Sequence, residues 1–219
     1  MISLCIWTKQ IGSKVVIHGD DDYQIYEIFN LLTAKECQTL IDIAKEKGLH
    51  ESKVYNHTVA DDGQEVDIVS RKSETTWLKD TEHPTVLKLA RITSEISRIP
   101  IENQEALQVA HYHVNGMFNE HYDACHYTDL SQCEKMNNGA GQRRCTLLVY
   151  LNDDFEGGET EFRDIKAKIK PEVGKAVFFW DTYPDEKIID KSKHIAHRIR
   201  QGEKWICTKW AHVKPYPNS

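Results

Sequence analysis

The chain has 219 residues, of which 40% are hydrophobic and 28% are charged, a composition typical of a globular domain and not of a disordered or fibrous protein. The formal net charge of −6 leaves no basic stripe to replace the counterions of nucleic acid, so no nucleic acid partner is expected. The N-terminal apolar run is too short for a signal peptide because Lys9 interrupts it, and no later stretch approaches the roughly 20 apolar residues of a membrane span. We therefore expect one domain over residues 1–219, located in the cytoplasm and without a membrane contact.

The first hundred residues predict two helices and a long polar connection. Residues 1–32 are expected to form short strands and turns. Thr33 and Glu36 are spaced as a capping box, which predicts a helix that runs to Gly48. Residues 50–76 are polar and predict a long mobile loop, since loops of that length are functional or disordered in most compact domains. A second helix is predicted to begin near Pro84 and to end before Pro100.

After Pro100 the pattern changes to strands rich in apolar, β-branched and aromatic residues. Residues 124–142 interrupt this pattern and predict a second long loop. Two helices followed by about eight strands indicate a mainly β protein with a double-sheet sandwich and helices packed on one sheet. Residues 1–105 would then support a core formed by residues 106–215. The predicted strands are 106–113, 117–123, 143–151, 158–163, 167–170, 175–181, 193–199 and 204–213.

The cysteines form neither a CxxC motif nor a tight framework, so we expect reduced thiols. Three possible zinc ligands share the second long loop, but they lack the paired spacing of structural zinc sites. A solvated loop is the simpler interpretation of that segment. The three possible ligands are Cys125, His126 and Cys133, and the other cysteines are Cys5, Cys37, Cys145 and Cys207.

A candidate metal site is indicated by His121 and Asp123, which lie two residues apart in a predicted strand and therefore share a face. A distal histidine would complete two imidazoles and one carboxylate, the ligand set of non-haem Fe(II) oxygenases. Either His194 or His197 could supply it, but only one can point inward from a strand. The distance of ten residues to Lys204 favours His194. Lys204 could be a surface lysine, but it opens an apolar strand, where a solvated role is less natural.

The order of the motifs resembles the prolyl 4-hydroxylase family, which comprises Fe(II)- and 2-oxoglutarate-dependent dioxygenases on a double-stranded β-helix, or jelly roll. The resemblance covers about residues 25–215. It implies a jelly-roll fold and an enzyme of the procollagen-proline 4-dioxygenase type that converts peptidyl proline to 4-hydroxyproline. It also implies Fe(II) as the cofactor, 2-oxoglutarate and O2 as co-substrates, and ascorbate as the reductant. The motifs are 107–123, RRCTLLVYLND at 143–153, GGET at 157–160, and 193–212.

The resemblance also implies roles for individual residues. His121, Asp123 and His194 match the iron ligands, and Lys204 matches the basic residue that binds the distal carboxylate of 2-oxoglutarate. A fixed cation inside an apolar barrel suits that carboxylate physically. Two further positions match 2-oxoglutarate contacts, namely Tyr112 and Thr160. Positions that match the groove for a proline-containing polypeptide are Arg71, Ser73, Glu105, Arg143, Trp210 and His212.

Two departures from the family pattern leave alternatives open. Phe118 stands where relatives often have tyrosine, and Arg198 stands where proline is common. The first removes a hydroxyl on the substrate side, so the same chemistry on another side chain or on a free amino acid stays possible. A non-catalytic jelly-roll binding domain is the third interpretation. The complete set of three metal ligands and a lysine argues against it.

Overall fold

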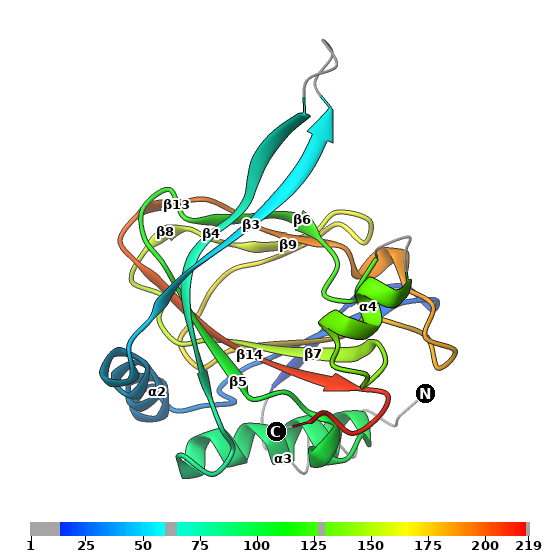
Figure 1. The fold of residues 1–219 in the computed structure, drawn as a ribbon. Helices are drawn as coiled ribbons and strands as arrows, with labels where there is room; N and C mark the ends of the chain where they lie inside the picture. The colour runs from blue at the N-terminus through cyan, green and yellow to red at the C-terminus, as the bar shows by residue number, and fades with distance from the viewer. Residues whose placement is uncertain (1–13, 60–64, 127–129, 218–219) are drawn as a thin grey trace.

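The computed structural model describes residues 14–59, 65–126 and 130–217, and the strands of this part form a nearly closed antiparallel barrel (Figure 1). Its main sheet has 12 strands among the described residues, eleven of them in the order β1-β2-β11-β7-β14-β5-β4-β6-β12-β9-β10, while β3 pairs with β4. A second sheet pairs β13 with β8. The strands are β1 (Val15–Gly19), β2 (Gln24–Ile28), β3 (His50–Val59), β4 (Glu65–Leu78), β5 (Leu107–Tyr112), β6 (Met117–His121), β7 (Arg143–Tyr150), β8 (Glu156–Gly157), β9 (Thr160–Phe162), β10 (Ala167–Ile169), β11 (Ala176–Trp180), β12 (His194–Ala196), β13 (Ile199–Gln201) and β14 (Lys204–His212).

This architecture confirms the predicted jelly-roll class. Strand β4 joins the two halves of the barrel, because its C-terminal part pairs with β5 while Arg71 and Lys72 pair with β6. The halves are therefore continuous through β4 instead of forming two separate sheets. The eight strand ranges predicted after Pro100 each contain at least one observed strand.

Both predicted helices are confirmed. Helix α2 (Ala34–Lys47) begins with the predicted capping box, in which the Thr33 hydroxyl accepts from the Glu36 amide and the Glu36 carboxylate accepts from the Thr33 amide. Helix α3 (Pro84–Ser97) begins at its proline and ends at Arg98 in the left-handed conformation. The remaining helical segments are α4 (Leu130–Met136) and the 3-10 turns η1 (Ile101–Asn103) and η2 (Asp190–Ser192).

The prediction of a mobile loop over residues 50–76 is wrong for the described part, which forms the β3–β4 hairpin. Its polar residues hid the strand, because several of them are buried against a polar interior and not against an apolar core. Ser70, Arg71 and Ser73 are all less than 9% exposed. In Figure 1 the hairpin extends well beyond the barrel.

The expectation of reduced thiols is wrong at one pair, since Cys125 and Cys133 form a disulfide. The predicted loop over residues 124–142 also contains the short helix α4, which carries Cys133. A disulfide has no thiolate to offer a metal, so the zinc alternative at this loop loses two of its three ligands. Among the described residues Cys37, Cys145 and Cys207 are free and buried, whereas Cys5 lies outside the described residues.

Two apolar clusters lie on opposite sides of the barrel wall. The outer one packs α2 and α3 on the sheet through residues such as Leu40, Leu89 and Leu147. The inner one fills one end of the barrel with side chains that include Tyr150, Phe162 and Phe179. Because the helices brace the wall from outside, inward-facing polar residues of β5, β7 and β14 are held on a rigid support.

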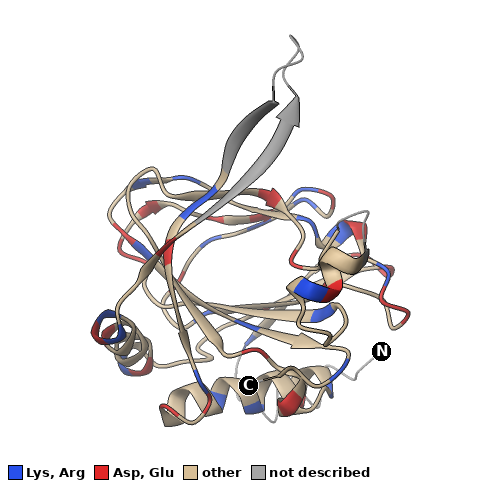
Figure 2. Cartoon of the chain, viewed as in Figure 1, with Lys and Arg blue, Asp and Glu red and all other residues tan. Residues whose placement is uncertain are grey.

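Acidic and basic residues are interspersed along the chain, as on helix α2, where both signs occur (Figure 2). None of the helices in the described part of the chain is long and apolar enough to cross a membrane.

Candidate metal and co-substrate site

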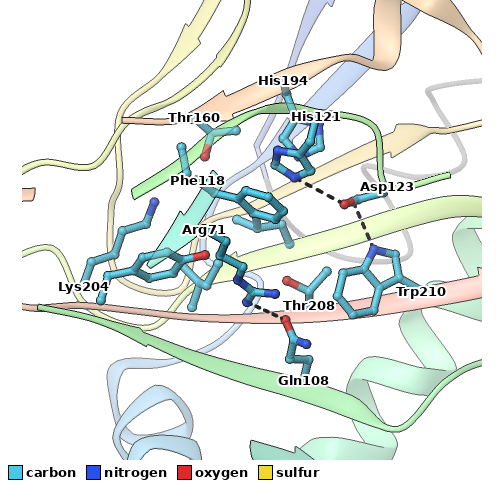
Figure 3. Close-up of a pocket in the computed structure, with 14 residues that line it drawn as sticks. Arg71, Gln108, Phe118, His121, Asp123, Thr160, His194, Lys204, Thr208 and Trp210 are labelled. Atoms are coloured by element: carbon cyan, nitrogen blue, oxygen red, sulfur yellow. Dashed lines mark hydrogen bonds and ion pairs between the residues drawn. The ribbon is translucent and has the colours of Figure 1, made fainter. Parts of the chain in front are cut away.

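A pocket opens inside the barrel and brings together eight of the predicted site residues (Figure 3). These eight are Arg71, Tyr112, His121, Asp123, Thr160, His194, Lys204 and Trp210. Six other residues line the pocket, and of these only Phe118 was named from the sequence, as a departure on the substrate side. The six are Gln108, Phe118, Leu148, Ala196, Ile206 and Thr208. Alternation along β14 could have identified two of them, since residues 204, 206, 208 and 210 share one strand face.

Three possible metal ligands converge at one end of this pocket. His121 ends β6 and His194 begins β12, and the two residues are paired across the strands. Asp123 follows β6, and its Oδ1 lies 3.6 Å from His121 Nε2. One ligand atom from each of the three residues lies within 4.8 Å of the others. His197 instead places its Nε2 2.7 Å from Glu161 Oε2, away from this group.

Both histidines in this group present a free lone pair toward the common centre. His121 Nδ1 lies 2.7 Å from the Asn119 carbonyl oxygen, and His194 Nδ1 lies 3.0 Å from that of Ser192. A carbonyl oxygen can only accept, so each Nδ1 carries a hydrogen, and in the neutral form of each ring the lone pair is on Nε2. Burial, together with the neighbouring His121, lowers the pKa of His194 to about 4, which keeps this ring neutral.

The orientation of the Asp123 carboxylate is fixed by two donors on its second oxygen. Trp210 Nε1 donates to Oδ2 over 3.0 Å, and the Thr146 hydroxyl lies 2.8 Å from the same atom. Burial opposes ionisation of Asp123, but the neighbouring His121 and His194 overcome this effect, so the pKa of Asp123 stays well below its ordinary value. The Oδ1 atom that faces His121 therefore belongs to an ionised carboxylate beside two imidazoles, and a carboxylate with two imidazoles is a donor set that fits Fe(II).

A second buried carboxyl completes this arrangement. Asp181 Oδ2 also lies 2.8 Å from the Thr146 hydroxyl, which has only one hydrogen to donate. Burial and the charge of Asp123 raise the pKa of Asp181 well above its ordinary value, so Asp181 holds a proton. It can then donate to Thr146, which donates to Asp123. Neither Thr146 nor Asp181 was predicted, because a lone buried threonine or aspartate carries no motif.

At the other end of the pocket lies Lys204, whose side chain is 1% exposed. Its Nζ donates to the Gly158 carbonyl oxygen over 2.6 Å and lies between the rings of Tyr112 and Tyr150, 5.6 Å and 5.4 Å from their centroids. In the described part of the chain no carboxylate forms a salt bridge with it. Burial lowers the pKa of Lys204 to about 7. A buried cation without a counter-ion is costly, and the carboxylate of a 2-oxo acid would compensate it.

The wall beside Lys204 is shaped by Gly158 and Thr160. Gly158 has a φ of +69°, and a Cβ there would lie 3.1 Å from Lys204 Cδ, so a larger residue would meet the lysine stem. Thr160 is buried and shares a 2.7 Å hydrogen bond with the hydroxyl of Tyr150, a residue that was not predicted. The GGET motif thus supplies both the space and a polar contact near the ammonium.

Arg71 enters the pocket from β4 and is held in place by two hydrogen bonds. Its Nε donates to Ser73 Oγ over 2.9 Å. Its Nη2 donates to Gln108 Oε1, also over 2.9 Å (Figure 3). The guanidinium lies 5.1 Å from the ring centroid of Phe118, and that ring stacks on His121 with 3.5 Å between centroids. Ser73 orients the arginine and does not line the pocket. The departure at Phe118 therefore places an apolar face beside a possible metal ligand.

Three predicted substrate residues lie behind the pocket instead of lining it. Glu105 binds Arg143 over 2.6 Å and His212 over 2.8 Å, and the Arg143 guanidinium lies 3.8 Å from the ring centroid of Trp210. Burial would raise the pKa of Glu105, but Arg143 and His212 overcome this effect and lower it to about 2. Glu105, Arg143 and His212 thus support Trp210 from the side away from the pocket.

Comparisons with known proteins show similarity to 2-oxoglutarate-dependent oxygenases and to prolyl 4-hydroxylases. Residues 107–212 match the model of the 2OG-Fe(II) oxygenase superfamily. The chain is 33% identical over 208 residues to probable prolyl 4-hydroxylase 10 of Arabidopsis thaliana, covering 85% of this chain and 68% of that protein. A putative prolyl 4-hydroxylase of Acanthamoeba polyphaga mimivirus is 32% identical, with 87% and 75% covered. Among solved structures, the viral collagen prolyl hydroxylase of Paramecium bursaria Chlorella virus-1 in its 2-oxoglutarate complex is similar, with a TM-score of 0.67, 32% identity, and coverage of 85% of this chain and 94% of that one.

Proposed function

Because the chain belongs to the prolyl 4-hydroxylase family of 2OG-Fe(II) oxygenases, we propose that it converts proline residues of a polypeptide to 4-hydroxyproline. The chain is a 2-oxoglutarate-dependent dioxygenase. In the reaction one atom of O2 enters the proline, and the other enters succinate as 2-oxoglutarate loses CO2. The observation that carries the proposal is the pairing of a His121, Asp123 and His194 cluster with an uncompensated buried Lys204 in one pocket.

In this proposal Fe(II) is held by His121 Nε2, Asp123 Oδ1 and His194 Nε2. The bound metal supplies the oxidation of the C–H bond, chemistry that belongs to the metal and its co-substrate. Trp210 and Thr146 keep one carboxylate oxygen occupied, so Asp123 can offer only the other to the metal. Such outer hydrogen bonds set the orientation and basicity of metal ligands.

The residues at the opposite end hold 2-oxoglutarate. Protonated Lys204 pairs with the distal carboxylate, and Thr160 and Tyr112 line the space between that carboxylate and the metal. Leu148 and Ile206 make the remaining wall apolar, which excludes water and strengthens the ion pair. A co-substrate held at both ends leaves the Phe118 and Arg71 side of the pocket for the polypeptide.

The polypeptide is proposed to approach over Arg71 and Trp210. An extended proline-rich chain suits such a groove because it loses little conformational entropy on binding. Arg71 would donate to a peptide carbonyl oxygen, while Glu105, Arg143 and His212 hold the Trp210 ring in position. Ascorbate is proposed as the reductant that restores the iron after turnover without substrate.

A second candidate substrate is another side chain or a free amino acid. It is favoured by Phe118, whose ring stacks on His121 and brings no hydroxyl to the side where the peptide would bind. The two candidates can be distinguished by the substrate whose hydroxylation accompanies succinate formation.

The test measures succinate and 4-hydroxyproline together, with Fe(II), 2-oxoglutarate and a proline-rich peptide. We expect equal amounts of both products, and neither from the His194→Ala variant. A matched peptide with alanine in place of every proline should yield only the low succinate background. Hydroxylation of free proline, but of no peptide, would replace the proposal by the small-molecule alternative.

A further inference from the structure

A second group of metal-ligating side chains lies on the outer face of the barrel, opposite the pocket. Side chains alternate along β5, so Tyr112 faces the pocket while His111 faces outward and stacks on Trp205 at 3.9 Å. His111 is paired with Glu74 of β4 and with Trp205 of β14. The group therefore joins the neighbouring strands β4 and β5 and lies beside Trp205 of β14 (Figure 1).

The possible metal-ligating atoms of this group lie close to one another. Glu74 Oε2 lies 3.3 Å from His111 Nδ1 and 3.1 Å from His113 Nε2. One ligand atom from each of the three residues lies within 4.8 Å of the others, as in the pocket cluster. The two imidazoles are in edge contact, with 4.1 Å between their centroids. Their positions are thus set by packing before any ligand binds.

A second carboxylate faces the remaining ring nitrogens. Glu203 Oε2 lies 3.0 Å from His111 Nε2, and its Oε1 lies 3.8 Å from His113 Nδ1. A neutral imidazole carries a hydrogen on one nitrogen and a lone pair on the other. On each ring the lone pair of one nitrogen would therefore point at a carboxylate oxygen, which is unfavourable. A bound cation removes this conflict without a second proton on either ring.

We propose that Glu74, His111 and His113 form a second divalent-metal site, of the zinc class, on the outer wall of the barrel. His111 binds through Nδ1 and His113 through Nε2, and both carry their hydrogen on the nitrogen that faces Glu203. Two imidazoles and one carboxylate are a zinc donor set, and carboxylates that accept from the far nitrogen commonly orient zinc-binding histidines. His113 and Glu74 are partly exposed, so water completes the coordination.

The site would connect strands that also carry the co-substrate residues on their inner faces. Tyr112 lies between the two histidines in the sequence, and Lys204 follows Glu203 directly. Tyr112 and Lys204 are themselves paired across β5 and β14. Zinc on the outer face would therefore cross-link the wall behind the proposed carboxylate pocket without entering it.

The test is equilibrium dialysis against zinc alone, with the bound metal counted by elemental analysis. The two histidines and the carboxylate of the pocket cluster are also a zinc donor set, so the wild-type chain should bind two ions. His113→Ala and Glu74→Gln should each bind one, and so should His121→Ala, which removes the other site. The double variant His113→Ala/His121→Ala should bind none. His18→Ala is the matched control, since His18 pairs with Glu27 over 2.9 Å outside both clusters, and it should bind two.

The ion that remains in His113→Ala also shows that this variant is folded. Binding of the same number of ions by His113→Ala and the wild type would overturn the proposal. So would a single ion in the wild type that His121→Ala abolishes. Neither result bears on proline hydroxylation, which depends on the pocket cluster and is measured separately.

Discussion

The indole Nε1–H of Trp210 donates a 3.0 Å hydrogen bond to Asp123 Oδ2, while Asp123 Oδ1 is the atom that faces His121 (Figure 3). Trp210 was predicted as a substrate residue, and it does line the pocket. Its hydrogen bond gives it a second role, because it decides which carboxylate oxygen is left for the metal. The same side chain therefore links the metal end of the pocket to the wall that the polypeptide would contact.

Replacing Trp210 by phenylalanine should weaken Fe(II) binding by about ten- to a hundredfold, the usual cost of losing an outer hydrogen bond to a metal ligand. The ring face over Arg143 is kept in this variant, so packing changes little. Anaerobic Fe(II) titration measures the effect. Trp77→Phe is the matched control, because Trp77 lies 5.9 Å from Trp210 and has no contact with Asp123. Unchanged Fe(II) affinity in Trp210→Phe would show that the hydrogen bond does not position the ligand.

The choice of the third ligand can be tested without turnover. Anaerobic Fe(II) and 2-oxoglutarate should produce the weak visible charge-transfer band of an iron-bound 2-oxo acid. His121→Ala and His194→Ala should abolish the band, because each removes an Nε2 from the cluster. His197→Ala should keep it, since this ring pairs with Glu161. A band that is lost in His197→Ala and kept in His194→Ala would reverse the assignment.

Lys204→Ala should weaken 2-oxoglutarate binding by about ten- to a hundredfold, because a hydrogen bond to a charged group contributes roughly 1.5–3 kcal/mol. Fe(II) affinity should stay the same, since Lys204 lies at the far end of the pocket. Lys204→Arg should restore binding only in part, because the planar guanidinium does not fit a site built for a compact ammonium beside Gly158. Titration of 2-oxoglutarate into the Fe(II) protein gives both affinities. Equal affinity of the wild type and of Lys204→Ala for 2-oxoglutarate would show that the lysine does not bind this co-substrate.

The affinity for 2-oxoglutarate should fall as the pH rises above 7. Burial lowers the pKa of Lys204 to about 7 in the free protein, so the ammonium is present below that pH and is lost above it. Each further pH unit then reduces the protonated fraction, and with it the apparent affinity, by up to about tenfold. Lys204→Arg should lose this dependence because a guanidinium stays protonated. An affinity that is flat across this range in the wild type would mean that the lysine keeps its proton without the co-substrate.

The parts that could be predicted from the sequence are those with a local cause. The Thr33 and Glu36 capping box and Pro84 begin helices through contacts within one turn, so their spacing alone is informative. The metal cluster was predicted because His121 and Asp123 are two residues apart on one strand face. His194 joined them only through its distance from Lys204, and the structure places it beside His121 through strand pairing.

The parts that were missed depend on partners far away in the chain. Strand β4 has a polar pattern in part because Arg71 lines the pocket and Ser73 holds it in place, so an apolar pattern could not reveal the strand. Gln108 and Asp181 become informative only beside Arg71 and Thr146, respectively. The disulfide joins Cys125 to Cys133 of α4, eight residues later in the chain. No spacing rule for six scattered cysteines selects that pair.

Arg71 is the residue by which the polypeptide end of the pocket can be tested apart from the chemistry. Its guanidinium is held by Ser73 and Gln108 and is only 8% exposed, so its remaining donors point in a fixed direction. Arg71→Ala should raise the KM for a proline-rich peptide by about tenfold or more, since a hydrogen bond from a charged group is lost. The charge-transfer band with Fe(II) and 2-oxoglutarate should be unchanged. More succinate should form per hydroxyproline, because a loosely held proline is oxidised less often.

Two variants make this result specific. Lys72→Ala removes a neighbouring positive charge. The Lys72 side chain is exposed, so this variant should leave the KM for peptide unchanged. Gln108→Ala should reproduce part of the Arg71→Ala effect, because it releases one of the two hydrogen bonds that orient the guanidinium. If Arg71→Ala instead weakened 2-oxoglutarate binding and left the KM for peptide unchanged, the arginine would belong to the co-substrate end. The polypeptide would then have to approach the metal from another side of the barrel.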